Sequence, residues 1–341
     1  MFTHEKKIDK LFLYWLIITL ILVFFIIIIG GLTRLTNSGL SITEWELFKG
    51  ILPPLNEKTW LIYFNLYKEI PQYKLLNNDM NLNDFKIIFY WEYLHRMIAR
   101  IIGIFFLIPL LFFYYSKKIN KFYMRICFLI FFLILFQGIV GWFMVKSGLI
   151  DNITVSHYRL AIHLIIAFII ISILFWLINN VIREKNILFL NFTKNNFFYL
   201  FLIFLIFIQI ILGAFVSGLD AGRIYQTWPY MGSSYIPNDI TFYNFEDAIN
   251  FNNHSLVQFY HRNFAYLILI YIFALSIYIF KKRLVYLFKP LKFLIFFLTI
   301  QIFLGISTLL SNLDIFIASA HQISSVLLVF SAINLYYHQT K

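Results

Sequence analysis

Two short polar stretches interrupt the apolar runs of this chain and carry side chains that could do chemistry. The first is EYLHR at residues 92–96, with Glu92, His95 and Arg96, and the second is QFYHR at residues 258–262. Lipid disfavours ionisable side chains, so those found within apolar segments usually have a function. Imidazoles bind metals or move protons, carboxylates accept protons, and guanidinium groups pair with anions.

The two polar stretches belong to an internal repeat. EYLHRMIA (92–99) aligns without gaps with QFYHRNFA (258–265). Three further pairs of segments recur with matching spacing: Gly30, Gly39 and Trp45 with Gly213, Gly222 and Trp228; Gln137 and Gly141 with Gln301 and Gly305; and LAIH (160–163) with ASAH (318–321). The repeat predicts two halves in the same orientation, as in other membrane folds with parallel repeats.

Composition indicates which elements must position these residues. The chain has 341 residues, of which 61% are hydrophobic, and a mean hydropathy of +0.79. Stretches of about 20 apolar residues, enough to cross about 30 Å of hydrocarbon, recur along it. We predict an all-α polytopic membrane protein with eight transmembrane helices in two pseudo-symmetric four-helix bundles. The helices are expected at about residues 11–31, 88–115, 126–146, 159–180, 197–217, 257–280, 292–311 and 318–337.

The net charge of +12 has a topological explanation. Five segments hold 16 Lys and Arg against 3 Asp and Glu, and the rest of the chain holds 12 against 13. These segments are residues 1–10, 116–125, 181–196, 281–292 and 338–341. All of them fall on one side of the predicted membrane, which the positive-inside rule makes cytoplasmic. Both termini are then cytoplasmic, and the charge does not indicate nucleic-acid binding.

Four histidines take equivalent places in this topology. His95, His163, His261 and His321 are all expected within the first two turns of helices that enter the membrane from the outer side, and so at similar depth near that face. Each could be a structural residue with an interhelical hydrogen bond, although four equivalent positions make this the weaker explanation. A proton relay would need deeper acidic partners, which the third to eighth helices lack.

The third interpretation is one bis-histidine haem site in each half, because imidazole is a common axial ligand of haem iron and helix bundles hold such sites. Gly103, Gly213 and the glycines of the Gln-x-x-x-Gly segments would make room for a flat macrocycle. Arg96 and Arg262 directly follow two of the histidines and suit haem propionates. Alternatively, they are interfacial arginines that reach toward water.

One difference between the halves points to chemistry. Glu92 lies three residues before His95 on the same helix face, and the matching residue in the second half is Gln258. One half therefore offers an ionisable group beside its haem and the other does not, unless Glu92 only pairs with Arg96 or Arg100. The asymmetry suggests one haem site for chemistry and one for a permanent haem.

Two long outer segments, 32–87 and 218–256, are rich in aromatic residues, which favours ordered structure over the histidines. The only cysteine, Cys127, falls within the third helix, so the chain can form no internal disulfide. His157 and His254 fall in or near the outer segments and receive no role.

Seven segments of the chain closely resemble the haem A synthase family of bacteria and mitochondria. They are GGLTRLTNSGLSITEWELFKGILPPLNEKTW (30–60), WEYLHRMIARIIG (91–103), QGIVGWFMVKSGL (137–149), SHYRLAIHL (156–164), GAFVSGLDAGRIYQTWPYM (213–231), VQFYHRNFAYL (257–267) and SAHQISSVLL (319–328). These segments run in order over nearly the whole chain. Because the first outer segment lacks a cysteine pair, the chain resembles the proteobacterial and mitochondrial branch.

The resemblance implies an oxidoreductase that converts the C8 methyl of haem O to a formyl group by two hydroxylations, through hydroxylated haem I, to give haem A for cytochrome oxidase. It implies that residues 1–196 receive haem O on His95 and His163, with Glu92 as the catalytic carboxylate. It further implies that residues 197–341 hold haem b iron on His261 and His321.

The resemblance also implies an enzyme in the bacterial inner membrane that works alongside haem O synthase, the protohaem farnesyltransferase, and cytochrome oxidase assembly. The electron donor, the source of oxygen, the exact role of Glu92 and the oligomeric state, including a homo-oligomer, stay open. The competing function is a dihaem electron-transfer cytochrome without catalysis. A haem chaperone for oxidase assembly is weaker, because no segment resembles a docking domain.

Overall fold

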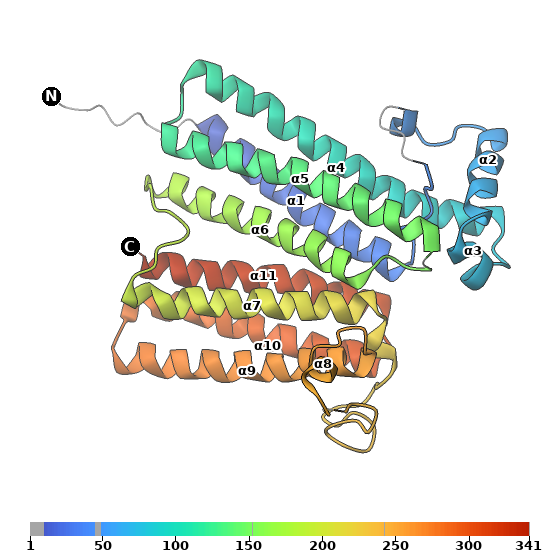
Figure 1. Ribbon diagram of the computed structural model, residues 1–341. Coiled ribbons are helices and arrows are strands. Elements are labelled where there is room, and N and C mark those ends of the chain that lie inside the picture. The colour runs from blue at the N-terminus through green and yellow to red at the C-terminus, as the bar shows by residue number, and fades with distance from the viewer. Residues whose placement is uncertain (1–9, 45–48, 152, 242, 341) are drawn as a thin grey trace.

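The computed structural model describes residues 10–44, 49–151, 153–241 and 243–340. Within them, eight long helices lie side by side and alternate in direction along the chain (Figure 1). They are α1 (Lys10–Leu35), α4 (Leu82–Ser116), α5 (Lys121–Asp151), α6 (His157–Ile182), α7 (Lys194–Gly218), α9 (His254–Lys281), α10 (Phe288–Leu310) and α11 (Ile315–Gln339). By length and composition all eight can cross a membrane, α10 together with the preceding turn, which confirms the predicted fold class.

The helices gather in two groups in chain order (Figure 1). Helices α1, α4, α5 and α6, blue to green in the figure, form one group, and α7, α9, α10 and α11, yellow to red, form the other. The groups meet through α1 and α6 on one side and α7 and α11 on the other. Apolar side chains from all eight helices form one continuous core cluster.

Polar contacts at two places, Arg34 and Ile27, tie α1 to the second half of the chain. The guanidinium of Arg34 pairs with the carboxylate of Asp220 at 3.0 Å. The side-chain amide of Gln322 on α11 donates to the carbonyl oxygen of Ile27 at 2.9 Å. Gln322 fits only because residue 31 is a glycine, since a Cβ on Gly31 would overlap its side chain.

Helix α4 begins six residues before the predicted start. The side chain of Asn81 accepts from the backbone N–H of Asp84, and the Asp84 side chain accepts from the N–H of Asn81, which is a capping box that fixes the start at Leu82. At 1.5 Å per residue, its 35 residues extend about 52 Å, well beyond a bilayer core of about 30 Å. The prediction that all four histidines lie in the first two turns is therefore wrong for His95, the fourteenth residue of α4.

The ends of the bundle differ. We call the end of the bundle that carries the connections 36–81 and 219–253 the long-loop end. The C-terminal end of α11 lies at the opposite end of the bundle (Figure 1). Both connections are shorter than predicted because α1 and α7 run on to Leu35 and Gly218, and α4 and α9 begin early. The opposite end holds the short connections 117–120, 183–193 and 282–284.

The first long connection is ordered by aromatic packing, as its composition predicts. It contains η1 (Lys49–Ile51), α2 (Glu57–Lys68) and α3 (Pro71–Leu76), while the second contains η2 (Ala221–Arg223) and α8 (Phe245–Ala248). Trp60, Phe64 and Tyr67 from α2 pack on Phe85 and Phe89 of the extended first turns of α4. Trp45, which belongs to the repeat, lies outside the described residues. In the second half of the chain, η3 (Val285–Leu287) directly precedes α10.

Candidate haem-binding site

Each of the four histidine rings lies against a glycine of a neighbouring helix. A Cβ placed on each glycine would come within about 3 Å of Cε1 of one ring: Gly30 at 3.0 Å from His95, Gly141 at 2.9 Å from His163, Gly213 at 3.1 Å from His261 and Gly305 at 2.9 Å from His321. The absence of a side chain at these four positions lets the imidazoles approach the helix backbone. The glycines that recur in the sequence thus each form a contact with a histidine, and this glycine–histidine contact is what the repeat preserves.

This contact gives these glycines a role that the sequence did not suggest. They make room for histidine rings, and their predicted role of making room for a macrocycle stays a prediction. Gly103 contacts no histidine ring, because a Cβ at that position would meet no protein atom within 4 Å, and its predicted role beside a macrocycle stays a prediction.

The histidines come together in two pairs, one in each group of helices. The rings of His95 on α4 and His163 on α6 have their centres 6.4 Å apart and their planes at 63°. His261 on α9 and His321 on α11 form the corresponding pair of the second group, since each ring lies against the repeat equivalent of the glycine that its counterpart contacts. The repeat and the family resemblance predict the same two pairs.

The first pair has a separation that fits one metal ion between two imidazoles. Two ring nitrogens at about 2 Å from an ion on opposite sides put the ring centres about 6 Å apart. Nδ1 of both His95 and His163 is buried and has no hydrogen-bond partner, so both rings keep unsatisfied nitrogen atoms inside an apolar bundle. Imidazoles placed in this way on facing helices fit the axial positions of a haem.

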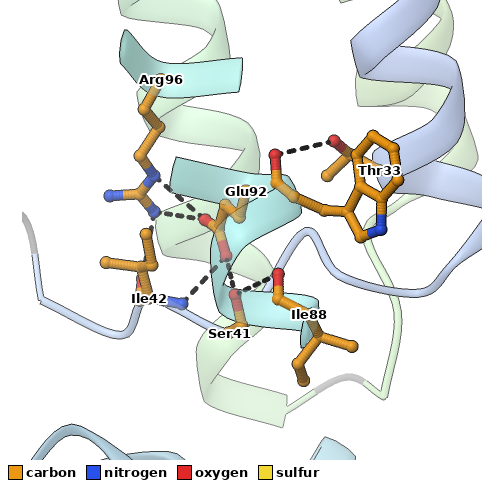
Figure 2. Close-up of polar contacts among 7 residues, drawn as sticks. Thr33, Ser41, Ile42, Ile88, Glu92 and Arg96 are labelled. Atoms are coloured by element: carbon orange, nitrogen blue, oxygen red, sulfur yellow. Dashed lines mark hydrogen bonds and ion pairs between the residues drawn. The ribbon is translucent and has the colours of Figure 1, made fainter. Parts of the chain in front are cut away.

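Glu92 lies one helical turn before His95 and is 3% exposed. Figure 2 shows its polar contacts. Its Oε1 accepts from Nε and Nη2 of Arg96 at 3.0 and 2.5 Å. Its Oε2 accepts from the hydroxyl of Ser41 at 2.7 Å and from the backbone N–H of Ile42 at 2.9 Å. In all four contacts the partner group donates a hydrogen bond and the carboxylate accepts it. An ionised carboxylate, which can only accept, requires such a set of donors.

The corresponding place in the second group is equally buried and differently bonded. Gln258 is 2% exposed, and its side-chain amide donates to the carbonyl oxygen of Tyr225 at 2.9 Å. Tyr225 is the repeat equivalent of Ile42, which presents its N–H to Glu92. The same loop position therefore offers a donor to the carboxylate in one half and an acceptor to the amide in the other.

The two arginines bind the long connections to the bundle. Arg96 donates to the carbonyl oxygen of Ile42 at 3.0 Å in addition to its ion pair. Arg262 donates to the carbonyl oxygens of Tyr225 and Thr227, both at 2.8 Å, and of Tyr230 at 3.3 Å. Both guanidinium groups lie at the long-loop end of their histidine pair, where they hold loop backbone in place.

Several residues of the site were not identified from the sequence. Ser41 and Ile42 complete the shell of Glu92, and Gln209 contacts His261. A signal for Gln209 was present, because Gln209 and Gly213 form a third Gln-x-x-x-Gly segment. His157, which received no role, packs its Cβ against Gly218 of α7.

These features define a class of protein: an eight-helix membrane protein with two partly buried histidine pairs, one of which has a buried carboxylate paired with an arginine beside it. Comparison with known proteins is more specific. Residues 13–333 match the COX15-CtaA family, described as cytochrome oxidase assembly protein, and the chain belongs to this family.

Several relatives named heme A synthase are similar over nearly their whole length. The protein of Pelagibacter ubique is 48% identical over 336 residues, which cover 97% of each chain. That of Rickettsia canadensis is 43% identical over 92% of this chain and 94% of its own. That of Ehrlichia ruminantium is 42% identical over 95% and 92%.

Proposed function

We propose that this protein is a haem A synthase, which oxidises the C8 methyl of haem O to a formyl group by two successive hydroxylations through haem I. The observation that carries the proposal is the pair of matched histidine sites of which only one has an ionised carboxylate beside it. A pure electron carrier has no need of this asymmetry. The relatives named heme A synthase, similar over more than nine-tenths of the chain, support the same activity.

The two halves then have separate tasks. Residues 1–196 would bind the substrate haem O through His95 and His163, next to Glu92. Residues 197–341 would hold a permanent haem b through His261 and His321. A haem with two histidine ligands has no open position for substrate and supplies single electrons.

Glu92 is the residue of this chain that can act on the substrate methyl. It can accept a proton or stabilise positive charge that develops there, and both roles require an ionised carboxylate. Ser41 suits proton acceptance, since its hydroxyl donates to Oε2 of Glu92 and also lies 3.3 Å from the carbonyl oxygen of Ile88. The hydroxyl can turn to that carbonyl when a proton reaches Oε2.

Arg96 and Arg262 are proposed to meet the propionate groups of the two haems, sharing their guanidinium groups with the loop carbonyls. The excess of Lys and Arg at the end opposite the long loops supports cytoplasmic termini in a bacterial inner membrane, with the haem sites toward the outer face. Haem O synthase, as the source of substrate, and the oxidase, as the consumer of haem A, are the expected neighbours in the pathway. The lipid bilayer surrounds the exposed apolar faces of the helices.

The test is haem extraction and chromatography from cells that lack their own haem A and express this protein with a haem O synthase. The wild type should produce haem A or its hydroxylated precursor. Glu92→Gln should lower turnover by about 10²–10⁴-fold, the range for loss of a positioned proton acceptor, while both haems stay bound. Gln258→Leu is the matched control in the other half and should retain turnover.

A different result would overturn the proposal. If folded protein with a bis-histidine spectrum yields only haem B and unchanged haem O, the protein is not this enzyme. That outcome would point to the dihaem electron-transfer cytochrome.

A further inference from the structure

The exposed apolar face of α4 is longer than the hydrocarbon core of a bilayer. Its members are spaced three, four or seven residues apart and so share one side of the helix. The face consists of Ile87, Tyr90, Leu94, Ile101, Ile104, Ile108, Leu111 and Tyr115. At 1.5 Å per residue, residues 87–115 extend about 42 Å, against about 30 Å for the hydrocarbon and about 40–45 Å for a bilayer with its headgroup layers. The face therefore reaches into a headgroup layer.

The lysines that follow α4 indicate which headgroup layer this is. Lys117, Lys118 and Lys121 come soon after Tyr115 in the chain, and tyrosines and lysines mark the border between lipid and water. About 30 Å of hydrocarbon, counted back from Tyr115, takes about 20 residues and ends near residue 95. The residues of the face before that point therefore lie outside the hydrocarbon, at the long-loop end.

The matched stretch of the second half is covered by its own loop. The repeat equivalents of Tyr90 and Leu94 are Leu256 and Tyr260. Leu256 is 1% exposed, and the hydroxyl of Tyr260 donates to the carbonyl oxygen of Ala248 in the second long connection at 2.8 Å. The first large apolar residue that α9 exposes is Leu267, the equivalent of Ile101. The exposed apolar residues of α4 before Ile101 are thus a property of the first half.

Helix α2 lies across this end of α4 and extends its exposed apolar face (Figure 1). The ring of Trp60 has its centre 4.9 Å from that of Phe89 and 5.4 Å from that of Tyr90. The next two residues of α2, Leu61 and Ile62, are 45% and 51% exposed. The turn of α2 that packs on α4 therefore also presents apolar side chains outward.

Lysines stand beside the aromatic rings of this region. Nζ of Lys86 lies 5.5 Å from the ring centre of Trp60, and Nζ of Lys68 lies 4.3 Å from that of Phe64. A lysine lays its stem along apolar surface and keeps its ammonium group at the polar border. Exposed apolar residues with tryptophan, tyrosine and lysine next to them are typical of helices that lie in the headgroup layer, where ammonium groups meet lipid phosphates.

We propose that α2 and the first turns of α4 lie in the headgroup layer of the bilayer at the long-loop end. Leu61, Ile62, Ile87 and Tyr90, which we call the surface patch, would face the upper acyl chains and glycerol groups. The patch continues the lipid-facing side of α4 without a break, which favours lipid over a protein partner as its occupant. The half proposed to take up a substrate then touches lipid headgroups near Glu92, while the other half is screened by its own loop. The inference requires no bound haem and goes beyond the proposed function.

The test is spin labelling of the full-length protein in vesicles of phosphatidylcholine and phosphatidylglycerol. Cys127 is the only cysteine and is buried, so a label reports on an introduced cysteine. Leu61→Cys, Ile62→Cys and Ile87→Cys each carry one label in the surface patch. Power saturation then compares oxygen, which concentrates in lipid, with a nickel chelate, which stays in water.

Two control positions calibrate the scale. Ile104→Cys, in the middle of the exposed face of α4, should be reached by oxygen and not by the chelate. Asp79→Cys, exposed and beyond the start of α4, should be reached by the chelate. The three patch labels should lie between these controls, with a ratio of oxygen to chelate accessibility several-fold above that of Asp79→Cys.

A second measurement tests the lysines. Adding phosphatidylglycerol to phosphatidylcholine should move the Leu61→Cys label deeper, because its headgroup is anionic. Lys68→Gln together with Lys86→Gln should remove this response. A label whose depth is the same in both lipids would contradict the contact of the lysines with phosphates.

The inference is wrong if the chelate reaches the patch labels as readily as Asp79→Cys, since the patch then faces water. It is also wrong if neither reagent reaches them, because a protein then covers the patch. Spectral broadening that disappears on dilution with unlabelled protein would identify that protein as a second copy of this chain. The labels stand on two helices, so one variant that fails to fold leaves the others to decide. Haem A formation plays no part in these readouts, so this inference and the proposed function can fail separately.

Discussion

The surroundings of Glu92 and Gln258 show how a repeated structure acquires two functions. Both residues begin the same motif, both are buried, and both bind the long connection of their own half through the matched residues Ile42 and Tyr225. The carboxylate takes an N–H from Ile42, and the amide gives a hydrogen to the carbonyl oxygen of Tyr225. The carbonyl oxygens of both loop residues accept from the arginine of their own half, so the two halves differ in which backbone group bonds residue 92 or 258.

The comparison teaches that the difference extends beyond one residue. Ser41 supplies a hydroxyl to Glu92, whereas its repeat equivalent Ile224 is an exposed apolar residue. An ionised carboxylate needs donors on every side, because burying a charge without them is costly. A neutral amide needs fewer hydrogen-bond partners than a carboxylate. The side-chain oxygen Oε1 of Gln258 has no hydrogen-bond partner among the described residues.

The largest expected difference in stability between the two halves follows from replacing the arginines. Arg96→Met leaves the carboxylate of Glu92 buried without its cation, which should lower the free energy of unfolding by about 3–5 kcal/mol. Arg262→Met removes bonds to neutral carbonyl oxygens and should cost about 1.5–3 kcal/mol. Thermal unfolding of both variants in the same detergent measures the difference.

The double variant Arg96→Met with Glu92→Gln is the control for this prediction. It removes the unpaired charge and should recover part of the lost stability. Equal losses in the two single variants would show that the ion pair in the first half contributes no more than the loop contacts in the second.

The next effect concerns the glycines, which the two halves share. Gly141→Ala and Gly305→Ala place a Cβ 2.9 Å from a ring carbon, so each ring must shift and the haem of its own half should bind about 10–100-fold more weakly. Visible spectra and haem content of the purified protein measure this. Gly103→Ala, where the Cβ meets no protein atom within 4 Å, should leave the histidine rings in place, so loss of haem from this variant would show that the macrocycle itself lies against Gly103.

A smaller effect sharpens the role of the first loop. Ser41→Ala removes one of four donors to Glu92 and should destabilise the protein by about 1.5 kcal/mol, the low end for a hydrogen bond to a charged group. Ile224→Ala at the matched position should cost less than about 0.5 kcal/mol. Comparable losses for the two variants would mean that the Ser41 contact adds nothing to stability.

The smallest effect lies in the second loop and depends on pH. Burial raises the pKa of Asp239, but hydrogen bonds from Ser255 and Tyr225 lower it more, so the pKa lies below its ordinary value. Asp239 therefore stabilises the folded state above its ordinary pKa of about 4, and this contribution is lost as the pH falls through the lower folded value. The wild type should unfold at a higher temperature than Asp239→Asn at pH 6, and the gap should close below about pH 4.

Much of the fold could be predicted from the sequence because membrane crossing depends on local composition. About 20 apolar residues in a row specify a helix wherever they occur, and the repeat pairs the helices of one half with those of the other. The start of α4 was missed because it depends on the cap formed by Asn81 and Asp84 beyond the apolar stretch. The order of the first loop was predicted from its aromatic residues, but its helices α2 and α3 were not.

The candidate site divides in the same way. The sequence by itself determined which residues could do chemistry, because Glu92 and the four histidines are polar groups that the surrounding apolar composition cannot explain. Only the tertiary structure decided what each of them meets: a glycine against every ring and four donors around Glu92. These contacts join helices and loops far apart in the chain, and hydrogen bonds depend on positions to within a few tenths of an ångström, which no local pattern of residues fixes.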